Sequence, residues 1–179
     1  MKRHIVIVGA PGCGKTTVVR RTLERLRAAG VEVFGFWTGE IRERGSRQGF
    51  DIESLAGKRA VMAHVGLKGG PSVSKYRVDV EAIESVAVEE IRRALREGLP
   101  GGILVMDEIG KMELFCAEFR DAVVAAVDGP LRVLATAMGK PHPFVESITQ
   151  RPDVEVVAVT AANRDGLPDV LIGKLAAAG

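Results

Sequence analysis

Short apolar runs alternate with one-sided amphipathic segments along most of the chain. The first run, residues 4–8, is apolar and β-branched, as expected of a strand buried in a parallel sheet. Residues 16–29 then place Val18, Leu23 and Leu26 on one face, which predicts a helix that Gly30 ends. The chain is therefore expected to begin with a strand, a glycine-rich loop and a helix.

The same alternation returns in the second half of the chain. Apolar runs predict strands at residues 31–37, 103–106, 131–137 and 154–160. Helices are predicted at 79–97, with Asp79 as its cap and Gly98 as its stop, at 118–127 and at 167–178. Strands alternating with helices indicate an α/β fold, in which a parallel sheet is flanked by helices on both faces.

Residues 38–65 break this alternation with short β-type runs separated by turn signals. Residues 45–49 are typical of a loop, 50–55 alternate, and Gly57 with Lys58 suits a two-residue hairpin before a strand at 60–65. We expect an inserted antiparallel β meander here, followed by a loop rich in Gly, Pro and Ser at 67–78. The length of 179 residues suits one domain spanning 1–179.

Composition excludes several classes of protein. Charged residues make up 27% of the chain and leave a net charge of +2, so nothing indicates nucleic acid or an acidic membrane as a partner. Apolar runs stay far below the ~20 residues that span a bilayer, and a signal peptide would overlap the first strand. The two cysteines, Cys13 and Cys116, form no C-x-x-C pair, which favours a reduced, cytoplasmic protein.

Residues 9–16, GAPGCGKT, match the phosphate-binding pattern G-x-x-x-x-G-K-[ST] at every fixed position. Glycines let successive backbone N–H groups turn toward phosphate oxygens, Lys15 reaches the outer phosphates, and the Thr16 hydroxyl can bind Mg²⁺. The loop lies between a predicted strand and a helix N-terminus, where an anion is favoured. We therefore expect nucleotide contacts from Gly9, Ala10, Pro11, Gly12, Cys13, Gly14, Lys15, Thr16 and Thr17.

A second motif, ILVMDE, occupies residues 103–108. Its buried strand is expected to end in Asp107, at the carboxyl edge of the sheet where ligands collect. Asp107 can then hold Mg²⁺, directly or through water, and Glu108 can polarise an attacking water. The alternative is an Asp-Glu pair that only caps the following helix.

Longer stretches around these motifs are more specific. They are TGEIRERGSRQGFDI at 38–52, DEIGKMELF at 107–115 and VTAANRD at 159–165. Together with the phosphate loop, they resemble the small nucleoside-triphosphatase family of thermophilic microbes, described in vertebrates as cancer-related nucleoside triphosphatase. The resemblance runs from the first strand to the last helix, with the motifs in family order.

The resemblance implies a P-loop NTPase with a RecA-like core. It also implies slow, Mg²⁺-dependent hydrolysis of several nucleoside triphosphates (ATP, GTP, CTP and UTP) to diphosphate and phosphate. Family nucleotide contacts fall here on residues 9–16 and 103–110, which adds Gly110 to Asp107 and Glu108. The cofactor it implies is Mg²⁺, and the protein partner is left unknown.

Two further loops carry candidate residues. The insertion holds Arg42, Arg44 and Arg47, and an arginine can stabilise the charge of a phosphoryl-transfer transition state; Arg47 is the strongest candidate. After the last strand, Asn163 can hydrogen-bond a base and Arg164 can stack on it. The alternatives are a solvated basic turn in the first case and a plain turn before a helix in the second.

Two other functions share these features. A nucleotide or small-molecule kinase would use the same core with the insertion as a lid, but it needs a second substrate pocket. A nucleotide-dependent switch would act through a partner and hydrolyse slowly. Hydrolysis remains our first hypothesis because Glu108 suits an attacking water.

Overall fold

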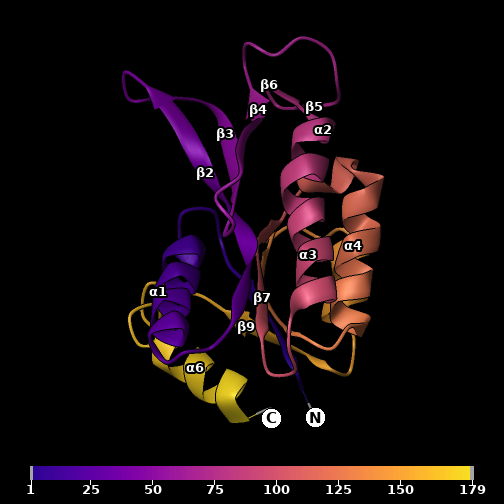
Figure 1. Cartoon of the computed structure of the whole chain (residues 1–179). Helices are drawn as coiled ribbons and strands as arrows, with labels where there is room; N and C mark the ends of the chain where they lie inside the picture. Colours follow the sequence, from indigo (N-terminus) through magenta and orange to yellow (C-terminus); the bar gives the residue numbers. More distant parts are fainter. Residues whose placement is uncertain (1, 178–179) are drawn as a thin grey trace.

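The computed structural model describes residues 2–177, which form one mixed sheet with helices on both faces (Figure 1). The first half of the chain forms β1 (His4–Val8), α1 (Lys15–Ala28), β2 (Val33–Glu43), β3 (Ser46–Ser54), β4 (Arg59–His64), β5 (Ser72–Val73), β6 (Tyr76–Val78), α2 (Val80–Ile83), a π-helical turn (Glu84–Val88) and α3 (Glu89–Glu97). The second half forms β7 (Ile103–Ile109), a 3₁₀ turn (Glu113–Phe115), α4 (Ala117–Asp128), β8 (Arg132–Ala137), α5 (Pro143–Thr149), β9 (Val154–Ala158) and α6 (Leu167–Ala177).

The strand order is β5-β6-β4-β3-β2-β7-β8-β1-β9. From β2 to β9 all neighbours are parallel, and from β2 to β5 they are antiparallel. β8 lies between β1, which leads into the phosphate loop, and β7, which carries the acidic pair. This order confirms the predicted RecA-like sheet.

Two apolar layers hold the helices on the sheet. On one face, α1 and α6 pack over β1 and β8, with Val19, Leu26 and Leu171 buried among them. On the other face, α3 and α4 pack over β2 and β7, with Phe36 and Phe119 in edge contact at 5.8 Å. Figure 1 shows these helix pairs on opposite sides of the sheet.

The insertion is an antiparallel meander, as predicted, but its boundaries differ. β2 continues without a break from the core into the insertion, so no loop separates the two. The predicted loop at 45–49 is wrong, because the turn is only Arg44 and Gly45, both at positive φ, and β3 begins at Ser46. The predicted loop at 67–78 contains the small β5–β6 hairpin. Both hairpins project beyond the helical layers (Figure 1).

Most other boundaries agree with the predictions within two residues. The Asp79 side chain accepts a hydrogen bond from the Ala82 N–H at 3.1 Å, which confirms it as a helix cap. β7, however, continues past Asp107 to Ile109, so the acidic pair lies within the strand. The predicted last helical residue, 178, lies outside the described residues.

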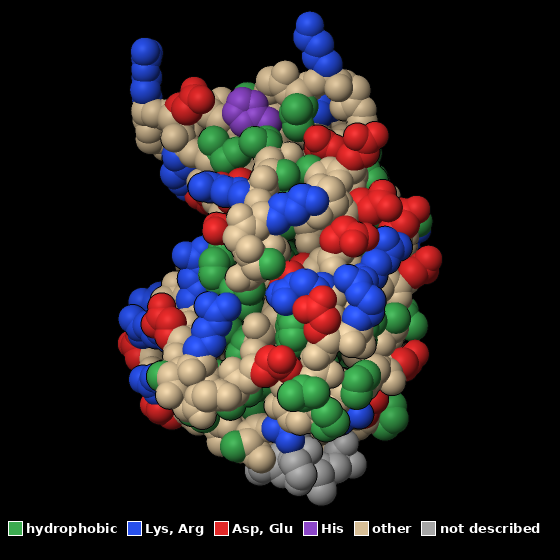
Figure 2. Space-filling view, in the orientation of Figure 1, with side chains coloured by type: hydrophobic (Ala, Val, Ile, Leu, Met, Phe, Trp, Pro, Cys, Tyr) green, Lys and Arg blue, Asp and Glu red, His purple; other side chains and the backbone are tan. Residues whose placement is uncertain are grey.

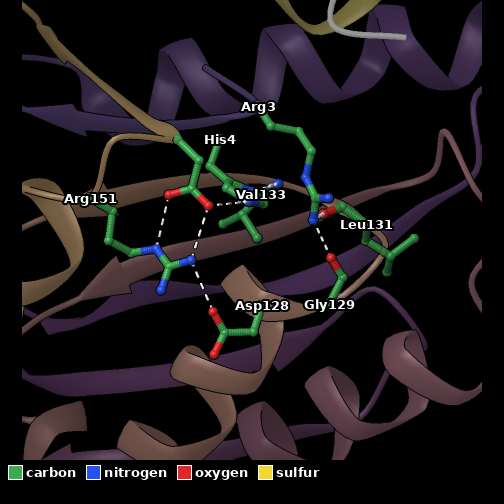
Figure 3. A network of polar contacts seen from close by, with 8 residues as sticks. Arg3, His4, Asp128, Gly129, Leu131, Val133 and Arg151 are labelled. Atoms are coloured by element: carbon green, nitrogen blue, oxygen red, sulfur yellow. Dashed lines mark hydrogen bonds and ion pairs between the residues drawn. The ribbon is translucent and has the colours of Figure 1, made fainter. Parts of the chain in front are cut away.

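A polar network joins the N-terminal end of β1, which is the end away from the phosphate loop, to the neighbouring segments (Figure 3). Arg151 bridges Asp128 at 2.9 Å and Asp153 at 2.9 and 3.0 Å. His4 is fully buried, and its Nδ1 accepts a hydrogen bond from the Val133 N–H at 3.1 Å. Burial, and then the Arg3 charge, lower the pKa of His4 to about 4, so the ring is neutral. This histidine is structural and lies far along β1 from the phosphate loop.

The first prediction concerns Gly35 in β2, which has φ of +140°. A Cβ there would lie 2.1 Å from the carbonyl oxygen of Val105 in the neighbouring strand. Because backbone cannot move aside cheaply, Gly35→Ala is expected to lower the free energy of unfolding by about 3 kcal/mol or more, combining overpacking and a disfavoured φ. Urea unfolding measures it. The control, Gly166→Ala, meets open space and should change stability by less than ~0.5 kcal/mol; equal effects would contradict the argument.

Candidate active site

The phosphate loop connects β1 to α1 in the geometry that the sequence predicts. Gly12 and Gly14 have φ of +75° and +107°, a region that L side chains rarely adopt. The Lys15 Nζ donates a hydrogen bond to the Gly9 carbonyl at 3.0 Å, so the ammonium lies against the loop. The loop is therefore shaped by its glycines and held by its lysine.

Close packing joins this loop to the end of β9. A Cβ at Gly9 would lie 2.6 Å from the Cys13 Sγ and 3.0 Å from the Val159 carbonyl oxygen. A Cβ at Gly14 would lie 3.3 Å from the Arg164 Cδ. Arg164 thus lies beside the phosphate loop, where we expected a nucleotide contact.

Asp107 is almost fully buried at the end of the sheet that carries the loop. Its Oδ1 accepts a hydrogen bond from the Thr136 hydroxyl at 2.5 Å, whereas its Oδ2 has no hydrogen-bond partner among the described residues. Burial raises the pKa of Asp107, and the hydroxyls of Thr136 and Thr16 oppose that rise. The structure therefore brings Thr16 and Asp107 together, with one carboxylate oxygen left over.

Glu108 lies next to the phosphate-loop lysine. Its Oε2 is 3.8 Å from the Lys15 Nζ, and its side chain is 31% exposed. Burial raises the pKa of Glu108, the Lys15 charge lowers it, and Asp107 raises it further. The two carboxylates of the acidic pair thus have different surroundings. Asp107 is buried against Thr136, whereas Glu108 is partly exposed beside the Lys15 ammonium.

Sequence reasoning missed two polar residues in this region. Thr136 is fully buried near the end of β8. In the sequence, the one feature that could have pointed to its role is a hydroxyl side chain late in the apolar run 131–137. Glu113 is 4% exposed, and burial raises its pKa to about 8, with the charges of Glu108 and Asp107 adding to the shift. A Cβ at Gly110 would lie 2.6 Å from the Glu113 Oε2 and 3.0 Å from the Glu108 Oε1. Gly110 thus lets the backbone pass between two carboxylates.

The remaining candidates have partners of their own. Arg47 donates hydrogen bonds to the Glu40 carboxylate in β2 at 2.7 Å and to the Tyr76 hydroxyl in β6 at 3.0 Å. No hydrogen bond or ion pair among the described residues joins it to the acidic pair.

The Asn163 amide accepts a hydrogen bond from the Thr160 N–H at 2.8 Å and donates one to the Ala158 carbonyl at 2.9 Å. Asn163 therefore shapes its own turn, and its contact with a base stays a prediction.

Sequence and structural comparisons reveal relatives of the whole chain. The NTPase family profile matches residues 4–172. The chain belongs to this NTPase family. It is 41% identical to the human cancer-related nucleoside-triphosphatase over 96% of both proteins. It is 42% identical to the nucleoside-triphosphatase THEP1 of Thermofilum pendens, over 97% of this chain and 96% of that protein.

Solved structures agree with this assignment. THEP1 from the hyperthermophile Aquifex aeolicus matches with a TM-score of 0.87 and 36% identity, over 98% of this chain and 99% of that one. The solution structure of a human cancer-related nucleoside triphosphatase matches with a TM-score of 0.83 and 39% identity, over 97% of each. The family resemblance, the P-loop NTPase fold and the assignment to the hydrolases are confirmed. Within residues 2–177, no helix has the length and apolarity to cross a membrane.

The second prediction concerns Glu113, whose pKa is about 8 in the folded protein against an ordinary 4.5. Between these values the folded protein keeps a proton that the unfolded chain has lost, so stability falls as pH rises. The loss is on the order of 4 kcal/mol. Glu113→Gln stays neutral and should remove this dependence. Its stability relative to wild type should therefore rise from pH 5 to pH 9 in urea unfolding without nucleotide or metal. Parallel pH profiles for the two proteins would refute a buried neutral Glu113.

Proposed function

We propose that this chain is a Mg²⁺-dependent nucleoside-triphosphatase that hydrolyses ATP, GTP, CTP and UTP to the diphosphate and phosphate. The observation that carries the proposal is the arrangement of four residues at one edge of the sheet. Lys15 and Thr16 begin α1, and Glu108 lies 3.8 Å from Lys15. Asp107 lies beside Thr16, and one of its carboxylate oxygens has no hydrogen-bond partner within residues 2–177. Family membership supports the same activity.

The residues present suit Mg²⁺. The free Oδ2 of Asp107 and the Thr16 hydroxyl are hard oxygen donors, which this ion prefers. No group of three or more His, Cys, Asp or Glu side chains within residues 2–177 forms a metal cage. That agrees with an ion bound through one carboxylate, water and substrate phosphates. Bound there, Mg²⁺ would neutralise charge on the phosphate oxygens.

In the proposed hydrolytic step, the phosphate loop, Lys15 and Glu108 each have a different role. Backbone N–H groups of the phosphate loop hold the β- and γ-phosphates, and Lys15 neutralises their oxygens. Glu108 orients a water and accepts its proton as the water oxygen bonds to the γ-phosphorus. The bond from that phosphorus to the β–γ bridging oxygen breaks, which leaves the diphosphate and inorganic phosphate. A role for Arg47 in this step remains a prediction, since its guanidinium is engaged by Glu40 and Tyr76.

The third prediction separates the two carboxylates. Glu108→Gln keeps shape but cannot accept a proton, so turnover should fall about 10²-fold or more while triphosphate binding survives. Asp107→Asn should instead weaken Mg²⁺ affinity, because the unpartnered oxygen loses its charge. Steady-state phosphate release and equilibrium triphosphate binding, each titrated with Mg²⁺, measure both effects. Near-normal hydrolysis by Glu108→Gln would remove Glu108 from the mechanism. Transfer of the γ-phosphate to an added nucleoside or nucleoside monophosphate would indicate a kinase.

The fourth prediction concerns breadth of substrate. The phosphate loop and Lys15 contact phosphates only, and the Asn163 amide already bonds its own turn. ATP, GTP, CTP and UTP should therefore be hydrolysed with comparable kcat/KM. The expected contact between Asn163 and a base is tested by Asn163→Ala, which should change relative KM values among the four nucleotides more than kcat. A preference above ~1,000-fold for one base, or about 4 kcal/mol, would show a dedicated base pocket.

A further inference from the structure

A cavity of about 530 Å³ lies between the insertion and the β5–β6 hairpin, outside the phosphate site. Its walls come from β2, β3, the β5–β6 hairpin and the segment after β7, and its lining residues are Arg42, Arg47, Phe50, Val73, Ser74, Lys75, Tyr76 and Met112. Cavities of this volume hold small organic ligands. In the space-filling view, Lys and Arg side chains lie around the narrow part of the molecule below the two hairpins (Figure 2).

Charge on this cavity is unbalanced. Arg42 and Arg47 share one carboxylate, Glu40, at 2.6 and 2.7 Å. The hydrogen bond from Arg47 lowers the pKa of Glu40, which is therefore ionised. Lys75, the third cation, has no ion pair among the described residues and lies 5.5 Å from the centre of the Tyr76 ring. Three cations against one carboxylate leave a net charge of +2, which matches a phosphate monoester dianion.

The same cavity has an aromatic wall. Phe50 and Tyr76 meet edge to face at 5.3 Å, and the Arg47 guanidinium lies 5.1 Å from the Phe50 ring centre. The hydrogen bonds from Arg47 to Tyr76 and Glu40 hold that guanidinium in place. Nucleobases stack on aromatic rings and on guanidinium planes. An inorganic phosphate ion would leave this wall uncovered.

We propose that this cavity, formed by the two hairpins, binds a second ligand, a nucleoside monophosphate. The phosphate would lie toward Arg42 and Lys75, and the base against Arg47 and the aromatic pair. A mononucleotide is favoured over a nucleic-acid strand because the chain carries a net charge of only +2. The site goes beyond the proposed hydrolysis, whose metal, water and phosphate contacts are assigned to the phosphate loop and β7; Arg47 alone is a candidate for both sites.

Isothermal titration calorimetry of the full chain with AMP tests this proposal, in the presence of Mg²⁺ and a saturating non-hydrolysable triphosphate. We expect one AMP to bind with Kd of ~1 mM or tighter, and adenosine or inorganic phosphate alone to bind at least tenfold more weakly. Lys75→Glu should weaken AMP binding at least tenfold, because it replaces the unpaired cation by an anion. Lys58→Glu, in the turn between β3 and β4, is the matched control and should leave Kd within twofold.

Several results would overturn the proposal. They are absence of AMP binding when the phosphate loop is filled, inorganic phosphate binding as tightly as AMP, equal effects of the two lysine variants, and a ten-nucleotide single strand binding more tightly than AMP. Phosphate release from ATP by Lys75→Glu is measured in parallel and should match wild type within twofold. Loss of AMP binding with normal turnover therefore tests the cavity alone, whereas a wild-type chain without turnover contradicts the proposed hydrolysis.

Discussion

Burial of one carboxylate constrains the site more than any other single feature. Asp107 is 1% exposed, and an ionised group in such surroundings costs free energy unless hydrogen bonds or a cation compensate it. Thr136 compensates one oxygen from β8, the strand that separates β7 from β1. The strand order thus has a chemical consequence, because it places a hydroxyl from a third strand between the phosphate loop and the acidic pair. The other oxygen has no hydrogen-bond partner within residues 2–177, and it is the one that we propose for Mg²⁺.

The segment after β7 shows a second electrostatic constraint. Glu108, Glu113 and Asp107 gather within seven residues, and the Lys15 ammonium lies 3.8 Å from Glu108. Full burial raises the pKa of Glu113 to about 8, so this carboxyl group is neutral near neutral pH and adds no negative charge to the group. Gly110 allows the backbone to pass between Glu108 and Glu113 without a Cβ to collide with either. A neutral buried acid and a glycine together make the crowded turn possible.

Sequence patterns predicted the parts of this molecule that local chemistry decides. The phosphate loop, the buried strands and the Asp79 cap follow from residue types at fixed spacing, and the structure has all three. The roles of Thr136 and Glu113 could not be read in the same way, because each depends on neighbours from another strand or on burial that only the assembled sheet creates. The turn at Arg44 was missed because a non-glycine residue there adopts positive φ.

Continuity of β2 links the core to the insertion. Its first half pairs with β7 beside the acidic pair, up to Trp37 against Asp107, and its second half pairs with β3 beneath the cavity. Met112, two residues beyond Gly110, closes one wall of that cavity. Cavity and phosphate site are therefore joined by one strand and one short turn. Glu108 at the end of β7 and Met112 on the cavity wall lie on either side of Gly110 along one continuous segment of backbone.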